Sequence, residues 1–442
     1  MGIDVQRFFN ACDPSITLSV GNAEDRKYYI DFAEVRGGKI IEKLARTITR
    51  STINKPTCQL FTGHIGCGKS TELRRLEAEL KVKGFHVVYF ESTQDLDMSD
   101  VDISDILLAI VRQVSQSLES VGIRLRPKYF ESLFNEVADF LQTPIEFSAE
   151  AGFSLPLGLG KITAKTKDSP KLRTKLRGFL EPRTNGILES INQEVLGAAI
   201  AQLIQQGQKG LVVIVDNLDR VDPRAKASGL SQPKYLFVER GEQLRRLNCH
   251  VVYTIPLSLT FSNNAQELIN RMGGGVPPET LPMVPVQLRN GIACEPGLNL
   301  LRRMVMKRAF PEIEYPEQQL GLITEVFDSL ETLNHLCWVS GGHVRTLMGL
   351  LYGCLRQDDP PIPRACLEGV IRIHRDGLAK AVEAHEWELL QQVVKQQSIS
   401  GEEGHDTLLR SLFVFEYLDE RGSWFSINPA LAETDRYKSW QQ

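Results

Sequence analysis

The chain has 442 residues, with 51 lysines and arginines against 55 aspartates and glutamates and a formal net charge of −4. This length allows about two to four domains, and 42% hydrophobic with 24% charged residues is typical of a globular protein. The charge balance excludes a protein whose whole surface is basic, so any contact with nucleic acid must come from a local patch.

Neither disulfides nor a membrane anchor are expected. Eight scattered cysteines include no C-x-x-C pair, which is typical of a reduced compartment. The N-terminus carries Asp4 and Arg7 where a signal peptide would need an apolar run. The longest uncharged stretch, about 251–266, is interrupted by Pro256. We therefore expect a cytoplasmic protein without a membrane span.

The first predicted domain is a doubly wound parallel α/β sheet over residues 58–290. Residues 1–57 lead into it and contain one amphipathic helix at 39–50. Apolar, β-branched runs predict buried strands, and helical periodicity between them predicts the crossovers of a parallel sheet. The expected strands are 58–62, 85–91, 211–215, 250–255 and 281–286, and the expected helices between them include 103–121, 128–142 and 186–206.

A phosphate-binding loop follows the first strand. Its spacing is Gly-x-x-x-x-Gly-Lys-Ser, between an apolar run and a helical pattern. Glycines let successive backbone N–H groups surround a phosphate at the positive end of the next helix. The lysine then reaches the β- and γ-phosphate oxygens, and the serine hydroxyl takes a Mg²⁺ position. The predicted nucleotide-binding residues are Gly63, His64, Ile65, Gly66, Cys67, Gly68, Lys69, Ser70 and Thr71.

An acidic residue ends the strand at 211–215. Asp216 follows five apolar residues, four of them β-branched, at the carboxyl end where ligands bind in such sheets. It is predicted to hold Mg²⁺ together with Ser70. Asp219, three residues on, is the first candidate to polarise an attacking water. The alternative is a strand followed by an acidic turn without function.

Residues 126–185 form an unusual insertion within this domain. From 145 to 159 apolar residues alternate strictly with polar residues, glycine or proline, which predicts a hairpin. Seven basic residues follow with a single acid, Asp168, among them: Lys161, Lys165, Lys167, Lys171, Arg173, Lys175 and Arg177. The stretch from Lys161 to Arg177 either contacts nucleic acid or a partner, or it is the solvated base of a flap that packs on the core. The absence of interleaved aromatic residues favours the flap.

Two further elements of the domain carry candidate catalytic groups. The strand at 250–255 contains Thr254, which either orients the γ-phosphate and water or is an ordinary hydroxyl at a strand end. The preceding helical stretch contains Arg240, Arg245 and Arg246. One of these arginines would reach a neighbouring subunit's γ-phosphate, unless all three belong to a solvated face.

Two smaller regions follow. Helical patterns at 297–310, 317–330 and 344–355 predict a helical lid over residues 291–358. Beyond the proline-rich junction at 358–363, helices at 367–384, 387–397 and 407–412 precede two strands around a turn at 419–422. Helices followed by a terminal hairpin are the outline of a winged-helix-like domain, placed at 364–442. Its hairpin is acidic, which favours a protein contact or autoinhibition over DNA binding.

These motifs together resemble the P-loop ATPases of the AAA+ and STAND type. The order is phosphate loop, acidic strand, polar strand end, and a helical region with the sequence SGGHVRTLM at 340–348. The last is similar to the start of the sensor-2 helix, where the resemblance implies that Arg345 touches the γ-phosphate. The spelling D-N-L-D-R at 216–220 is similar to those of the NACHT and KAP ATPases. AAA+ proteins of the origin-recognition type carry a winged helix at the C-terminal position.

Two positions depart from the AAA+ pattern. Asn217 stands where these enzymes place a catalytic glutamate, so either Asp219 supplies the base or hydrolysis is slow and the nucleotide acts as a switch. The segment that would run over the adenine only loosely matches, and it offers Tyr29, Ile30 and Val35 as base contacts.

The predicted function is therefore a Mg²⁺-dependent ATPase that binds ATP and acts as a nucleotide-driven assembly or regulatory switch. A homo-oligomer or a protein partner is expected. The alternative is a DNA-binding AAA+ loader or remodeller that uses the basic insertion and the C-terminal domain.

Overall fold

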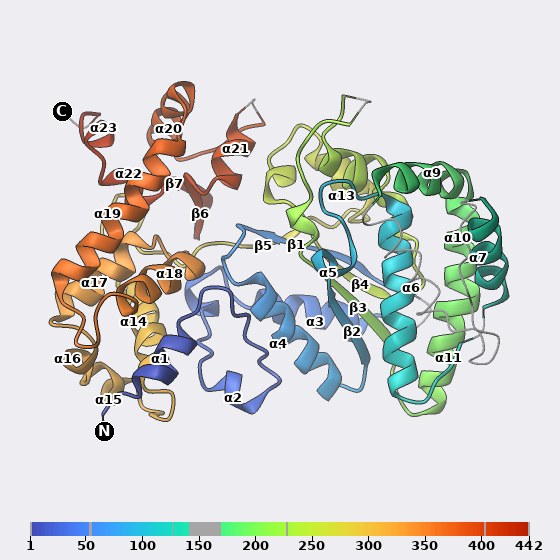
Figure 1. The fold of residues 1–442 in the computed structure, drawn as a ribbon, viewed down its shortest axis with the longest axis horizontal. Helices are drawn as coiled ribbons and strands as arrows, with labels where there is room; N and C mark the ends of the chain where they lie inside the picture. The colour runs from blue at the N-terminus through green and yellow to red at the C-terminus, as the bar shows by residue number, and fades with distance from the viewer. Residues whose placement is uncertain are drawn as a thin grey trace.

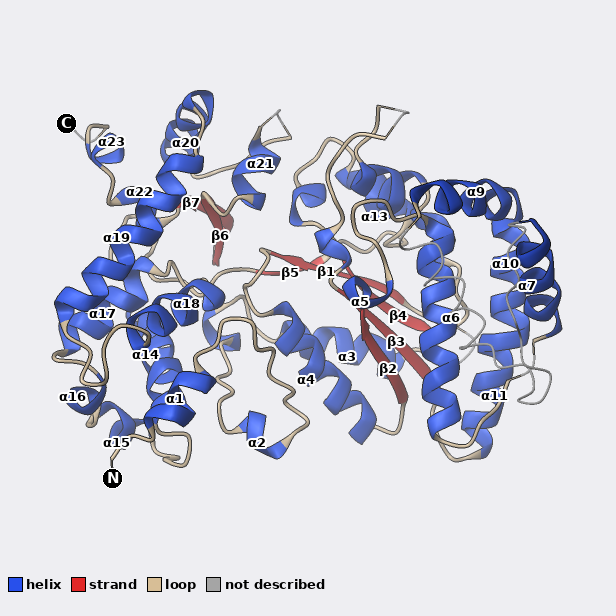
Figure 2. Ribbon diagram, in the orientation of Figure 1, coloured by secondary structure: helices blue, strands red, loops and turns tan. Residues whose placement is uncertain are grey.

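The computed structural model describes residues 2–52, 55–125, 127–140, 169–226, 229–401 and 404–440. Its centre is a five-stranded parallel sheet with helices on both faces (Figures 1 and 2). The doubly wound α/β fold predicted from the sequence is confirmed. The strands, in the spatial order β2-β3-β4-β1-β5, are β1 (Cys58–Gly63), β2 (His86–Glu91), β3 (Leu211–Asp216), β4 (His250–Thr254) and β5 (Glu279–Leu281).

Alternation along the strands divides the core between the two faces of the sheet. Val213 and Val215 of β3 face one cluster with Val251 and Tyr253 of β4, whereas Val212 and Ile214 face the other cluster. The second cluster is covered by α3 (Ile40–Arg50), the amphipathic helix predicted at 39–50, and by α4 (Lys69–Val82).

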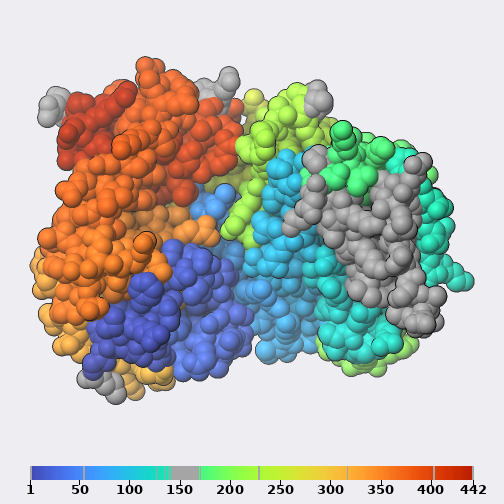
Figure 3. Space-filling model, viewed as in Figure 1, coloured from blue at the N-terminus to red at the C-terminus, as the bar shows by residue number. Residues whose placement is uncertain are grey.

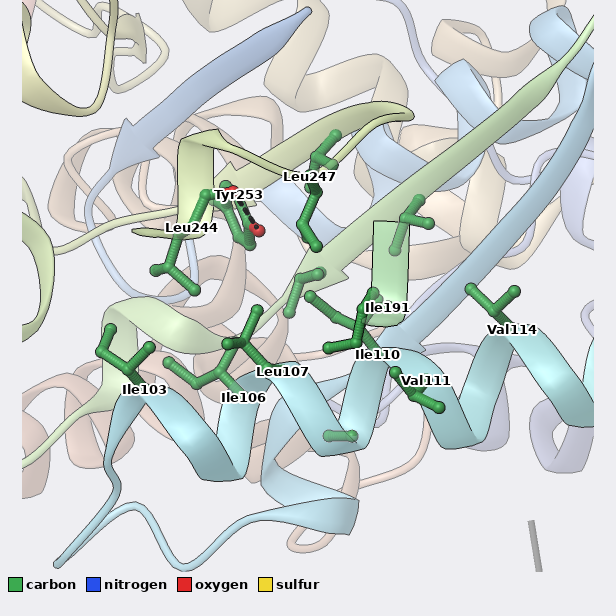
Figure 4. Packing of buried hydrophobic residues seen from close by; sticks show 14 of the residues in the cluster. Ile103, Ile106, Leu107, Ile110, Val111, Val114, Ile191, Leu244, Leu247 and Tyr253 are labelled. Atoms are coloured by element: carbon green, nitrogen blue, oxygen red, sulfur yellow. Dashed lines mark hydrogen bonds between the residues drawn. The ribbon is translucent and has the colours of Figure 1, made fainter. Parts of the chain in front are cut away.

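The first cluster is covered by a larger helical layer. Figure 4 shows α6 lying along it, with Ile106, Ile110 and Val114 directed into the cluster and the Tyr253 hydroxyl donating to the Leu244 carbonyl. The helices of this layer and its neighbours are α5 (Ser92–Asp95), α6 (Ile103–Ser120), α7 (Lys128–Phe140), α9 (Pro170–Leu180), α10 (Thr184–Ser190), α11 (Ala198–Gln205), α12 (Gly241–Arg245) and α13 (Ala265–Arg271). A π-helical turn, Ile191–Gly197, joins α10 to α11, so the helix predicted at 186–206 is continuous.

The fifth strand is shorter than predicted. β5 ends at Leu281, whereas the sequence predicted a strand at 281–286. Pro282 and Pro285 cannot donate to a strand ladder, so the chain leaves β1 there. The N–H of Met283 donates instead to the carbonyl of Glu416 near the C-terminus, at 2.9 Å.

A second helical group follows β5 in sequence and adjoins the sheet on the left of Figure 1. The helix predicted at 317–330 is broken into two short ones, and a further helix precedes the one predicted at 344–355. The helices are α14 (Glu295–Ala309), α15 (Pro316–Leu320), α16 (Ile323–Val326), α17 (Leu330–Val339) and α18 (Val344–Leu355). Near the N-terminus, α1 (Val5–Ala11) packs on this group, as Figure 3 shows for one face.

The C-terminal part has the predicted order of helices and hairpin. Its helices α19 (Arg364–Ala381), α20 (Ala384–Gln396) and α21 (His405–Arg410) precede the antiparallel strands β6 (Val414–Asp419) and β7 (Gly422–Ile427). Two short helices follow, α22 (Pro429–Ala432) and α23 (Asp435–Lys438). The boundaries of the lid and of the C-terminal domain stay predictions.

The hairpin packs on the sheet instead of projecting into solvent. Phe415, Tyr417 and Trp424 belong to the same buried cluster as Phe61 of β1 and Leu281 of β5. A salt bridge between Arg289 and Asp419, at 2.5 Å, anchors its tip. The acidic residues that made the hairpin a poor DNA wing therefore face the rest of the protein, at least at Asp419 and the buried Glu416.

The remaining predictions concern the hairpin at 145–159, a membrane span and the cysteines. The hairpin predicted at 145–159 lies outside the described residues. Among the residues that are described, no helix is both long and apolar enough to cross a membrane. All eight cysteines are free thiols.

Candidate functional site

The loop between β1 and α4 has the backbone shape of a phosphate cradle. Gly63, Gly66 and Gly68 all have positive φ, at 148°, 88° and 105°. A Cβ on Gly63 would lie 2.5 Å from the Leu281 carbonyl oxygen, and a Cβ on Gly66 would lie 2.6 Å from the His343 ring. These positions need glycine because both the backbone conformation and the space exclude a side chain.

The loop lysine is buried and ion-paired. Lys69 Nζ lies 2.9 Å from Asp219 Oδ2 and donates to the carbonyls of Gly63 and His64, both at 2.8 Å. Burial lowers the pKa of Lys69, but the Asp219 carboxylate and other neighbouring groups raise it by more. The pKa therefore lies above its ordinary value. The ammonium group is therefore charged and already points at the loop.

Only one of the two carboxylate oxygens of Asp219 takes part in this ion pair. Its Oδ1 is buried and has no hydrogen-bond partner among the described residues. The 3₁₀ turn Leu218–Arg220 carries it, and Asn217 enters that turn in the left-handed region, with φ 63°. Asparagine adopts this conformation more readily than most residues, so Asn217 shapes the turn at the position where AAA+ enzymes place glutamate.

Thr254 holds the same turn through the backbone. Its hydroxyl accepts from the Leu218 N–H at 2.9 Å and donates to the Val215 carbonyl at 3.4 Å. The side chain is fully buried. The observed contacts make Thr254 a residue that positions the Asp219 turn, and its contact with a γ-phosphate stays a prediction.

Asp216 ends β3 beside a second carboxylate. Asp216 and Glu91 are paired in register at the carboxyl ends of β3 and β2. Asp216 Oδ2 accepts from the Tyr89 hydroxyl at 2.6 Å and Oδ1 from the Asn217 N–H at 2.7 Å, while the Asn217 amide donates to Glu91 at 3.3 Å.

This donor set fits magnesium. Mg²⁺ is usually held by one or two carboxylates, with waters and substrate phosphates completing its octahedron. Asp216, and Ser70 at the start of α4, would supply the protein ligands. Within the described ranges, no group of three or more His, Cys, Asp or Glu side chains could hold a metal ion by itself.

The first turn of α18, in the predicted lid, contacts the phosphate loop. The Arg345 N–H donates to the Gly66 carbonyl at 3.2 Å, and His343 Nε2 lies 2.8 Å from the Ile65 carbonyl. Burial and the nearby Arg220 both lower the pKa of Arg345. Arg345 and Arg220 line the same cavity as Lys69, so positive charge converges on its phosphate end.

His64 faces away from this cavity. Its ring is 2% exposed, and Nε2 accepts from the Glu416 N–H of β6 at 2.9 Å. Burial lowers its pKa to about 3, so the ring is neutral. The His64 side chain therefore holds the hairpin, while its backbone remains part of the loop.

The cavity beside the loop has an apolar far end. Of the three residues predicted to contact the base, Tyr29 and Ile30 line this cavity and Val35 does not. Its apolar and aromatic lining outside the phosphate loop comprises Pro14, Ile16, Leu18, Tyr28, Tyr29, Ile30, Phe32, Met304, Val344 and Met348. Such a slot suits a flat, largely apolar group such as a nucleobase.

The three finger candidates lie on or beside α12. Arg240 contacts Glu181, Gln243 and the Tyr235 hydroxyl of its own chain, whereas Arg245 and Arg246 are exposed. A contact of any of them with a neighbouring subunit stays a prediction.

Several site residues escaped the sequence reasoning because only the fold brings them together. Arg36 is buried and donates to the carbonyls of Cys67 and Pro282, at 2.9 and 2.7 Å. From the neighbouring strand, Tyr89 donates to Asp216, and Glu91 stands opposite Asp216 in register and accepts from Asn217. Of these residues, only Glu91 could have been found from the sequence, because it ends the strand predicted at 85–91.

Two of the four basic residues in the described part of the basic stretch are ion-paired. Arg177 pairs with Asp100 at 2.7 Å and with Asp102 at 3.2 Å, and Arg173 pairs with Asp97. Lys171 and Lys175 are exposed. The two arginines are thus engaged within the fold. Residues 161–168 lie outside the described ranges, so the choice between the flap and a nucleic-acid contact stays a prediction.

Comparison with known proteins agrees with this geometry. The KAP family P-loop domain matches residues 38–237. The core of the chain is thus a P-loop NTPase domain, and its predicted resemblance to the KAP family is confirmed. No curated protein matches the chain significantly in sequence.

Similar solved structures include three origin-recognition proteins. The Aeropyrum pernix ORC1 protein in complex with DNA is 14% identical, with a TM-score of 0.35 over 91% of this chain and 93% of that one. Drosophila ORC bound to DNA is 10% identical, with 0.39 over 100% and 92%. The Aeropyrum pernix ORC2 protein (ADPNP–ADP complexes) is 13% identical, with 0.39 over 90% and 91%. At these identities and TM-scores the likeness carries no information about function.

Proposed function

We propose that this protein is a Mg²⁺-dependent ATPase in which the bound nucleotide acts as a switch. The observation that carries the proposal is the pair between Lys69 and Asp219 at 2.9 Å. A buried lysine at the end of a glycine cradle is held by a carboxylate that a phosphate can replace.

Each polar group then has a separate task. The loop N–H groups and Lys69 bind the β- and γ-phosphates, and Arg345 neutralises charge that develops on the γ-phosphate. When bound at Asp216 and Ser70, Mg²⁺ supplies further charge neutralisation at the phosphates. Once phosphate takes over Lys69, Asp219 is released to orient a water.

The proposed reaction is hydrolysis of the terminal phosphoanhydride. Water attacks the γ-phosphorus, the bond from that phosphorus to the bridging oxygen breaks, and ADP leaves. Asp219 accepts the proton of the water. Because Asp219 is released only when Lys69 changes partner, nucleotide occupancy and the shape of the 3₁₀ turn are linked.

Slow turnover and regulated assembly fit the same site. Asn217 replaces the usual catalytic carboxylate, and the loop is tied to the lid through His343 and to the C-terminal hairpin through His64. A nucleotide that rearranges the loop therefore acts on both, which supports a switch that alters contacts with a second copy or a protein partner. DNA loading stays the alternative, and the ion pairs of Arg173 and Arg177 weigh against the basic stretch as its site.

The test is ATP turnover and native mass of the purified protein, measured with and without ATP. Lys69→Ala should abolish nucleotide binding, and Asp219→Asn should bind nucleotide more tightly and lower turnover. General-base removal is expected to lower turnover by roughly 10²–10⁴-fold. Binding without turnover in the wild type would exclude the enzyme and leave the switch. Wild-type protein that binds no nucleotide would overturn the proposal.

A further inference from the structure

Arg308 is a buried arginine without a partner for its charge. It lies on α14, one turn after Met304, and is 6% exposed. Its Nε has no hydrogen-bond partner among the described residues. The contact that the structure gives it is the ring of Tyr28, whose centroid lies 5.3 Å from Cζ. Burial lowers the pKa of Arg308, with only partial compensation from Cys12, Tyr28 and Asp25.

A guanidinium in this state favours a ligand. Removing a charge from water is unfavourable unless the charge is paired, and arginine carries only donors, so acceptors are needed. Asp25 is the carboxylate among the groups that partly compensate the Arg308 charge, but its Oδ2 already accepts from the Ser19 N–H. The described residues thus give Arg308 a ring contact and no acceptor, and Arg308 lines a cavity in which a ligand could supply one.

The position of Arg308 indicates which part of a nucleotide would meet it. Arg308 lines the same cavity as the phosphate loop, together with Ile16, Leu18 and Tyr28. These four residues also line a second cavity that contains no residue of the loop. They therefore mark the end of the nucleotide cavity away from the phosphates, where a nucleotide bound on the loop places its base.

We propose that Arg308 sets the base preference of this cavity by donating hydrogen bonds to acceptors on the edge of a purine. The inference rests on the proposed nucleotide site. Guanine presents two adjacent acceptors, N7 and O6, which match the planar fork of arginine. Adenine presents N7 beside the N6 amino donor, which the guanidinium cannot accept. The site of the proposed ATPase is therefore expected to bind GTP as well as ATP, and Arg308 is the residue that raises the affinity for GTP.

The experiment measures affinities for ATP, GTP and 7-deaza-GTP by displacement of a fluorescent ADP from the full-length protein. Arg308→Met keeps the length and apolar volume of the stem, and Arg303→Met on the same helix is the matched control, since Arg303 does not line the cavity. Loss of a bidentate contact predicts that Arg308→Met weakens GTP binding by roughly 5- to 150-fold. ATP should change much less, and 7-deaza-GTP should lose part of the GTP affinity in the wild type alone.

Stability separates a base contact from a structural role. Replacing an unpaired buried charge by an apolar side chain is expected to leave the melting temperature unchanged or higher. An equal loss of ATP and GTP affinity together with a lower melting temperature would overturn the inference, as would an unchanged ratio of the two affinities. Wild-type protein that binds neither nucleotide would overturn the proposed function instead. Lys69→Ala serves as the non-binding reference for that outcome in the displacement assay.

Discussion

Replacing Asp219 by asparagine should tighten nucleotide binding. In the free protein Lys69 donates to Asp219 across 2.9 Å, within a site where both side chains are 5% exposed or less. A phosphate that binds Lys69 must displace this carboxylate. A hydrogen bond between charged groups contributes about 1.5–3 kcal/mol, and each 1.4 kcal/mol is tenfold in affinity. Asp219→Asn should therefore bind ADP roughly 10- to 150-fold more tightly.

Calorimetric titration of ADP into the wild type and the variant measures this difference. Asp222→Asn is the matched control, because Asp222 lies three residues on and pairs with the exposed Arg224 instead. The free variant should also melt at a lower temperature, since Lys69 is left buried without its carboxylate. Equal or weaker ADP binding by Asp219→Asn would refute the idea that the carboxylate competes with phosphate.

Three further outcomes are expected. Glu91→Gln should keep nucleotide affinity and lower turnover less than Asp219→Asn does; the reverse order in steady-state kinetics would assign the base to Glu91. Burial raises the pKa of Glu416 to about 7, so the folded state holds a proton that the unfolded chain releases, and stability falls by about 3 kcal/mol between pH 4.5 and 7. Glu416→Gln should remove this slope in urea unfolding, and a difference from wild type that is constant with pH would contradict it. Arg177→Ala should lower stability by about 1.5–3 kcal/mol because its bonds to the partly exposed Asp100 and the buried Asp102 are lost, whereas Lys175→Ala should change it by less than about 0.5 kcal/mol; equal melting temperatures would show that the ion pairs are not structural.

The phosphate loop and the strands that flank it could be predicted because their signals are local. Glycine, lysine and serine at fixed spacing define the cradle, and β-branched runs define β3 and β4 wherever they lie in the fold. Asp216 was predicted for the same reason, since it directly ends such a run. The strand at 281–286 failed because the apolar pattern was given more weight than the two prolines within it.

The remaining contacts of the site depend on packing between distant segments. Nothing in the spelling of the loop indicates that His64 accepts from Glu416, which is 352 residues away. Arg308 is an ordinary arginine on an amphipathic helix until the fold closes α14 against the N-terminal segment. The acids that neutralise Arg173 and Arg177 lie about 75 residues earlier, so the basic stretch had seemed less compensated than it is.

The docking of the C-terminal hairpin bears on how the chain is made. The backbone of β6 supplies the partner of the Met283 N–H, and its N–H at Glu416 meets His64 in the phosphate loop. During synthesis the loop leaves the ribosome long before residues 414–427 exist. Until then Phe61, Leu281 and Met283 lack the aromatic side chains that cover them. The nascent P-loop core thus carries an exposed apolar edge, and the loop completes its packing only after the hairpin has been translated.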